Sequence, residues 1–195
     1  MVANLLIFLG IAVGYLACFK TEDGWSVKAG IDSLRFFTLI SNLFCAFAAL
    51  AMALAFAFGG GHIPYWVWLC KFIGTASVTV TLFTVMLFIG PMVGYESQLY
   101  GNGLLLHLVA PLLSIASFCF SERFYPLSAG LATVGVLPVF LYGLFYMYKV
   151  IFCKTDKRWD DFYGYNKHGL WPLSFAAMML GSVACCLLIR ILYQL

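Results

Sequence analysis

Residues 36–58 of the chain read FFTLISNLFCAFAALAMALAFAF, a run of apolar residues without a charged side chain. A transmembrane helix needs about 20 mainly apolar residues to cross a hydrocarbon core about 30 Å thick. This run is therefore long enough to span a membrane as one helix. Its clearly polar residues, Thr38, Ser41 and Asn42, all lie near the start of the segment.

Five further segments have the same apolar character: 2–19, 66–90, 102–120, 127–150 and 170–193. Short polar or turn-forming stretches separate them. The first segment lacks a basic leader and a small-residue cleavage site, so we expect a retained helix rather than a signal peptide. The sequence predicts an all-α fold, a polytopic membrane bundle of about six transmembrane helices. We expect residues 1–195 to form a single integral membrane domain.

The composition excludes several classes of protein. Of the 195 residues, 64% are hydrophobic and 10% are charged, and the mean hydropathy is +0.98. Soluble domains are nearer half apolar and a quarter charged. The net charge of +3 is scattered, so we expect no nucleic-acid partner. The seven cysteines form no C-x-x-C pair and no zinc-like cluster with histidine. We expect no metal and no cofactor.

The basic residues predict an orientation. The loops after the first, third and fifth helices, with the adjacent helix ends, carry Lys20, Lys28, Arg35, Lys149, Lys154, Lys157, Arg158 and Lys167. The opposite face has only Lys71, Arg123 and Arg190. Lys and Arg are enriched in cytoplasmic loops of membrane proteins. The bias of eight to three therefore predicts that the first face is cytoplasmic.

Polar residues at membrane depth are costly, so they face the bundle interior and can mark a site. Thr38, Ser41, Asn42 and Cys45 follow helical spacing and share one face of their helix. His107 lies in the fourth apolar segment, which starts from the same membrane face as the second. At the helical rise, Thr38 lies about 3 Å and His107 about 8 Å below that surface. These depths are compatible with contact between the two side chains.

The loop 157–168 reaches the same membrane face and carries carboxylates, phenols and an amide. We expect Asp160, Asp161, Tyr163 and Asn166 to lie over the mouth of a site formed by the helices. The simpler interpretation is a solvated connection between the last two helices.

Structural explanations for the polar residues also stay open. A transmembrane threonine often bonds back to a carbonyl of its own helix, an asparagine often joins two helices, and a lone histidine can be a packing residue. Two alternatives to an enzyme follow. One is a small transporter or channel that uses the polar residues as a path, and the other is a non-catalytic membrane scaffold.

The segments around Thr38 and His107 resemble a known family. Arg35-Phe36-Phe37-Thr38 followed by Ser41-Asn42, together with Asn102, His107 and Pro111, is similar to two segments of the androgen-induced and androgen-dependent TFPI-regulating membrane proteins. These are six-helix threonine hydrolases that cleave fatty acid esters of hydroxy fatty acids. Bacterial six-helix membrane proteins are similar over the same segments.

The resemblance implies that Thr38 is a nucleophile and His107 its base, acting on a membrane lipid or other acyl-ester substrate. A threonine hydroxyl becomes a useful nucleophile when a neighbouring base takes its proton, and imidazole gains and loses a proton near neutral pH. Such a site also needs a donor for the oxyanion. Asn42, one turn from Thr38 on the same face, is the candidate, with Ser41 lining the site beside it.

Overall fold

The computed structural model describes residues 1–153 and 157–195. Within those residues six helices are long and apolar enough to cross a membrane: Val2–Phe19, Phe37–Phe58, Tyr65–Val93, Asn102–Ser121, Ala129–Phe152 and Trp171–Gln194. The predicted all-α bundle is confirmed, and the chain is a multi-pass integral membrane protein. The boundaries agree with the sequence to within a few residues at each end.

Short 3₁₀ and π turns, labelled η, interrupt several of these spans. The first half of the chain contains α1 (Val2–Leu16), η1 (Ala17–Phe19), β1 (Lys20–Thr21), β2 (Gly24–Trp25), α2 (Val27–Ser33), α3 (Phe37–Phe58), α4 (Tyr65–Thr84), η2 (Val85–Ile89), α5 (Gly90–Val93) and α6 (Tyr95–Leu99). The second half contains α7 (Asn102–Leu104), η3 (Leu105–Val109), α8 (Ala110–Ser121), α9 (Ala129–Ala132), η4 (Thr133–Val136), α10 (Leu137–Met147), η5 (Tyr148–Phe152), η7 (Lys167–Gly169) and α11 (Trp171–Gln194).

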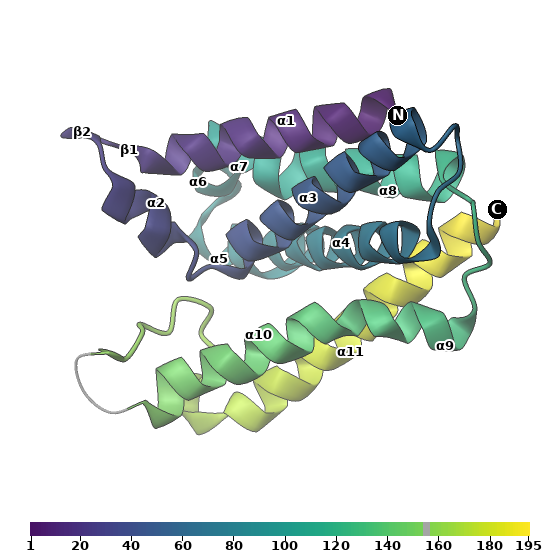
Figure 1. Cartoon of the computed structure of the whole chain (residues 1–195). Helices are drawn as coiled ribbons and strands as arrows, with labels where there is room; N and C mark the ends of the chain where they lie inside the picture. The colour runs from purple at the N-terminus through teal and green to yellow at the C-terminus, as the bar shows by residue number, and fades with distance from the viewer. Residues whose placement is uncertain (154–156) are drawn as a thin grey trace.

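The long helices run side by side in alternating directions, and both chain ends lie at one end of the bundle (Figure 1). We call that end the terminal face; it also carries residues 59–64 and 122–128. The other end, the loop face, carries residues 20–36, 94–101 and the described part of 153–170. The helices beginning at Phe37, Asn102 and Trp171 therefore start from one face, as predicted. Lys154, one of the basic residues assigned to this face, lies outside the described residues.

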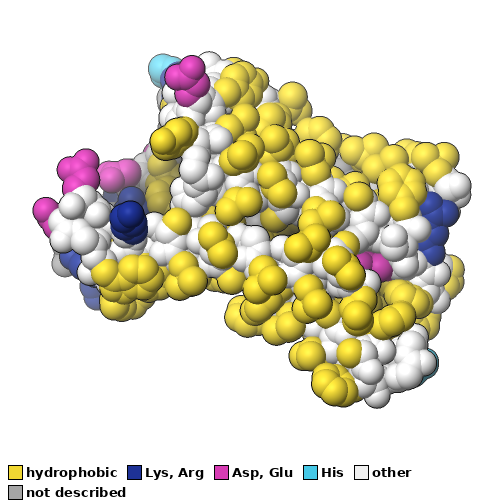
Figure 2. Space-filling view, turned by 90° about the horizontal axis from the view of Figure 1, so that it is seen from above, with side chains coloured by type: hydrophobic (Ala, Val, Ile, Leu, Met, Phe, Trp, Pro, Cys, Tyr) yellow, Lys and Arg dark blue, Asp and Glu magenta, His cyan; other side chains and the backbone are white. Residues whose placement is uncertain are grey.

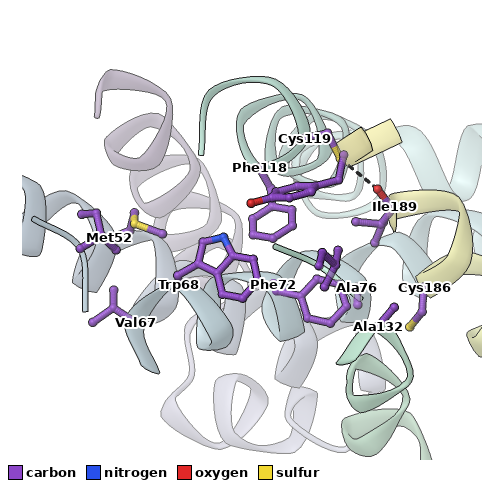
Figure 3. Close-up of a cluster of buried hydrophobic side chains, with 13 residues drawn as sticks. Met52, Val67, Trp68, Phe72, Ala76, Phe118, Cys119, Ala132, Cys186 and Ile189 are labelled. Carbon is purple, nitrogen blue, oxygen red and sulfur yellow. Dashed lines mark hydrogen bonds between the residues drawn. The ribbon is translucent and has the colours of Figure 1, made fainter. Parts of the chain in front are cut away.

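The bundle is apolar on its outside and holds its polar groups within. Figure 2 shows hydrophobic side chains over the middle of the molecule, with most of the charged ones near its two ends. Towards the terminal face, the Trp68 and Phe72 rings of α4 lie 5.8 and 5.7 Å from the Phe118 ring of α8 (Figure 3). Gly74 lets α4 approach α3 closely, because an added Cβ would lie 2.9 Å from Cys45 Cα.

Prolines explain two of the π turns. Proline has no N–H and its ring crowds the carbonyl four residues earlier, so a regular α-helical turn cannot be completed there. Pro91 lies just after η2, and Pro111 lies just after η3. The residue four positions before Pro111 is His107. The fourth span therefore has π-helical and not α-helical geometry at His107. π turns of this kind are often found at functional sites.

The connection between the first two spans holds structure that the sequence analysis did not predict. Strands β1 and β2 form a two-stranded antiparallel hairpin, in which Lys20 pairs with Trp25. Helix α2 follows, and the Ser26 hydroxyl caps it by accepting a hydrogen bond from Ala29 N–H at 3.2 Å. These elements cover part of the loop face beside the start of α3.

Candidate active site

A cavity of about 220 Å³ lies at the loop face. Its walls come from η1, from Phe36 and the first turn of α3, and from the segment running from α6 to η3. The lining residues are Cys18, Phe36, Thr38, Leu39, Ser97, Tyr100, Asn102, Gly103, Leu106 and His107. The structure therefore places Thr38 and His107 in the lining of the same cavity.

Thr38 is the second residue of α3 and is half-buried. Its carbonyl accepts hydrogen bonds from Ser41 Oγ at 3.1 Å and Asn42 Nδ2 at 2.8 Å. The preceding N–H, that of Phe37, donates to Tyr163 Oη at 3.1 Å. The first turn of α3 is thus fixed both from inside the bundle and from the loop. Thr38 also lies at the helix N-terminus, where the helix dipole favours negative charge.

His107 lies in η3 and is half-buried. Its Nδ1 lies 2.7 Å from the backbone oxygen of Gln98. A carbonyl oxygen can only accept, so this contact requires a proton on Nδ1 and leaves the Nε2 of a neutral ring as a proton acceptor. Gly103 makes the arrangement possible, because a side chain there would collide with the Gln98 carbonyl.

Asn42 is fully buried behind Thr38 and joins two helices. Its Nδ2 donates to Thr38 O at 2.8 Å and to Leu106 O at 3.1 Å. Both amide hydrogens are therefore used, and the predicted oxyanion role would require one of these bonds to break. Ser41 contacts Thr81 Oγ1 at 2.9 Å. Neither Asn42 nor Ser41 belongs to the cavity lining.

Asn102 does line the cavity, at the start of α7. Its Nδ2 donates to Gly14 O at 3.4 Å and to Cys18 Sγ at 3.5 Å. The bond to Gly14 is longer than the usual N–H···O range and is therefore weak. From the sequence, Asn102 is marked only as part of the family resemblance and not as a site residue. Its position ahead of His107 in that motif was the available signal.

The loop residues predicted at the mouth have mainly structural contacts. The Asp161 carboxylate accepts hydrogen bonds from Tyr146 Oη at 3.1 Å and from the Tyr165 and Asn166 N–H groups, each at 2.7 Å. Burial raises the pKa of Tyr163 to about 12, so its hydroxyl stays protonated at neutral pH. Tyr163 connects the loop to α3, whereas Asp160 is exposed.

The polar side chains that line the cavity offer three hydroxyls, a thiol, an imidazole and an amide: those of Thr38, Ser97, Tyr100, Cys18, His107 and Asn102. Its lining contains no carboxylate and no lysine or arginine. Within residues 1–153 and 157–195, no three His, Cys, Asp or Glu side chains are grouped to hold a metal ion. A hydroxyl and an imidazole with a fixed tautomer in the lining of one cavity are the groups that acyl transfer through a covalent intermediate uses.

Comparison of the chain with models of known protein families, with curated proteins and with solved structures finds no match.

Proposed function

We propose that the protein hydrolyses fatty acyl esters at the membrane, with Thr38 as nucleophile and His107 as general base. The observation that supports this most directly is that the two residues line one cavity from separate helices. The bond from His107 Nδ1 to the Gln98 carbonyl adds to it, because Nε2 is then the basic nitrogen. The similarity of both segments to the threonine hydrolases points to the same pair.

The proposed reaction has two halves. In the first, Thr38 Oγ attacks the ester carbonyl carbon while His107 Nε2 takes the hydroxyl proton, and the tetrahedral intermediate collapses as the imidazolium protonates the departing alcohol. In the second, His107 Nε2 takes a proton from water as the water oxygen attacks the carbonyl carbon of the acyl-threonine. The bond from that carbon to Thr38 Oγ then breaks, the imidazolium returns the proton to Thr38 Oγ, and the acid is released. The Gln98 carbonyl favours the imidazolium in both halves by accepting from Nδ1.

Asn102 is the side chain we assign to the oxyanion. It lies in the cavity lining, and its weak bond to the Gly14 carbonyl can be exchanged for a bond to a developing negative charge. Asn42 acts differently in this proposal. It holds the Thr38 carbonyl and the Leu106 carbonyl together and so fixes the spacing of the nucleophile and base segments.

The size of the cavity bears on the substrate. At about 220 Å³ it is smaller than the pockets of roughly 300–1,000 Å³ that enclose whole drug-sized ligands. It has room for an ester group and the carbons beside it, with Phe36, Leu39 and Leu106 as apolar walls. The remainder of an acyl chain would extend into the bilayer. Fatty acid esters of hydroxy fatty acids are the substrates to test first.

Labelling with a fluorophosphonate probe tests the proposal in detergent-solubilised protein. The wild type should be labelled at Thr38 and should release acid from an acyl ester, and Thr38→Ala should do neither. Thr133→Ala is a matched control, because Thr133 is exposed in η4 and bonds only its own helix, through Gly130 O. Absence of wild-type labelling and hydrolysis, or labelling that persists in Thr38→Ala, would refute the assignment.

A small transporter is the second candidate, and a buried lysine favours it. Lys71 is 0% exposed within the first two turns of α4, and its Nζ donates to Ser114 Oγ at 3.4 Å. Ser114 Oγ in turn contacts Thr75 Oγ1 at 2.8 Å and Cys45 Sγ at 3.4 Å. Ionisable residues inside membrane spans often mark ion pathways. Ion flux into proteoliposomes that is lost in Lys71→Met, without ester hydrolysis by the wild type, would favour this candidate.

A further inference from the structure

A second cavity, of about 60 Å³, lies at the opposite end of the bundle, on the terminal face. It is formed where the first turn of α1 meets the last turns of α3 and α8. Its lining residues are Met1, Asn4, Met52, Phe56, Ile63, Ser121, Glu122 and Phe124. Most of this lining is apolar, and Asn4, Ser121 and Glu122 are the exceptions.

Two oxygen atoms of these lining residues are buried without a hydrogen-bond donor. Glu122 is 5% exposed and Asn4 is 1% exposed. Asn4 Nδ2 donates to Glu122 Oε1 at 2.8 Å, which joins the two side chains. Glu122 Oε2 and Asn4 Oδ1 have no partner in the described structure. Buried polar atoms left unpaired are costly, so these two oxygens are suited to accept from a donor or to bind a cation.

The charge at the second cavity, around Glu122, is negative. Glu122 is the C-cap residue that follows Ser121, the last residue of α8, and the helix dipole adds partial negative charge there. Arg123 is directed elsewhere: its Nε donates to the Cys119 carbonyl and its guanidinium lies 5.7 Å from the Phe120 ring centre. Lys71 bonds to Ser114, which is two turns before Glu122 on α8. Within the described residues, Glu122 has no ion pair.

We propose that this cavity binds one monovalent alkali cation, with Na⁺ as the ion to test. The ligands are Glu122 Oε2, Asn4 Oδ1 and the Ser121 hydroxyl, since hard cations prefer oxygen donors. A single carboxylate balances a single positive charge, whereas protein sites for Ca²⁺ commonly supply several carboxylates. A volume of about 60 Å³ leaves room for an ion with one or two waters. The ion would tie α1 to α8 on the face opposite the first cavity.

Thermal unfolding of the purified full-length protein tests the site. Na⁺ should raise the melting temperature above that in choline chloride of equal ionic strength, because a ligand that binds only the folded state stabilises it. Glu122→Gln should abolish the difference. Glu96→Gln removes an exposed carboxylate at the loop face and should keep it.

Direct binding of radioactive sodium gives a measurement that does not depend on a variant folding. The wild type should bind one ion per chain, and Asn4→Ala and Ser121→Ala should each weaken binding by about tenfold or more. Equal wild-type melting temperatures in sodium and choline, or a sodium shift retained by Glu122→Gln, would overturn the proposal. Stabilisation by low pH but not by sodium would overturn it as well, because a proton would then satisfy the carboxyl group.

Discussion

At the scale of the residue, the candidate site separates what a sequence can predict from what it cannot. The common face and similar depth of Thr38 and His107 follow from helical spacing and from counting spans. The hydrogen-bond partner of His107 could not be predicted in this way. The Gln98 carbonyl lies in an irregular connection, and no periodic sequence pattern indicates its path. The bonds that occupy Asn42 were equally hidden, since they depend on how α3 is rotated against the fourth span.

If Thr38 and His107 act as one unit, Thr38→Ala and His107→Ala should each lower kcat for ester hydrolysis by about 10⁴-fold or more. The double variant should lose little more, because catalytic partners are strongly non-additive. Single-turnover kinetics in detergent measures these effects. Loss of a buried polar contact in a membrane bundle costs only about 0.6 kcal/mol on average, so the variants should remain folded. If the kcat of the double variant fell by the product of the two single losses, Thr38 and His107 would not act in the same catalytic step.

The two asparagines should respond differently to truncation. Asn102→Ala should lower kcat by about 10²–10³-fold with little change in melting temperature, as expected for an oxyanion donor. Asn42→Ala should chiefly lower stability, by about 1–2 kcal/mol, because it removes the donor to the Leu106 carbonyl and one of the two side-chain donors to the Thr38 carbonyl. Comparing kcat with thermal stability for both variants separates the roles. If Asn42→Ala lowered kcat and Asn102→Ala lowered only stability, Asn42 would be the oxyanion donor.

At the scale of the element, the transmembrane spans could be predicted from the sequence, whereas the short elements and the turns that interrupt the spans could not. Long apolar segments are unambiguous in a sequence, and all six were located. The hairpin β1–β2, α2 and α6 were missed, because elements of two to seven residues carry too little pattern to stand out from a loop. The π turn at His107 was also missed, although Pro111 in the sequence is its physical cause.

Replacing Pro111 tests whether that turn positions the base. Pro111→Ala restores an N–H and allows an α-helical bond to the His107 carbonyl, which should rewind η3 and turn the imidazole away from the cavity. We expect hydrolysis to fall by at least about tenfold while the melting temperature is unchanged or higher. Pro91→Ala makes the same change after η2, whose residues do not line the cavity, and should leave activity intact.

The loop that packs on α3 should respond to alkaline pH. Burial raises the pKa of the Tyr163 hydroxyl from an ordinary value near 10 to about 12. The folded state therefore holds this proton more tightly than the unfolded state. Its contribution to stability is complete below about pH 10 and is lost as the pH rises towards 12. Tyr163→Phe should flatten part of the fall in melting temperature over that window. An unchanged pH profile would mean that Tyr163 is not linked to unfolding.

At the scale of the whole molecule, the two cavities lie at opposite ends of one bundle. Thr38 and His107 line the one at the loop face, and Asn4 and Glu122 line the one at the terminal face. Alternation of the spans, which the sequence predicted, fixes this separation. The buried contacts of Lys71 and Glu122 could not be predicted in the same way, because they depend on which sides of α4 and α8 face inward.

We propose that the loop face is cytoplasmic, because seven of the ten basic residues in the described part of the chain lie on it or at the adjacent helix ends. Cysteine labelling in intact cells measures this. Asp23 and His62 are exposed on the loop face and the terminal face respectively. An impermeant maleimide should label His62→Cys and leave Asp23→Cys unlabelled until the cells are opened. Wild-type protein gives the background that arises from its seven native cysteines. Labelling of Asp23→Cys alone would place Thr38 and His107 on the outer face, where the enzyme would meet esters from outside the cell.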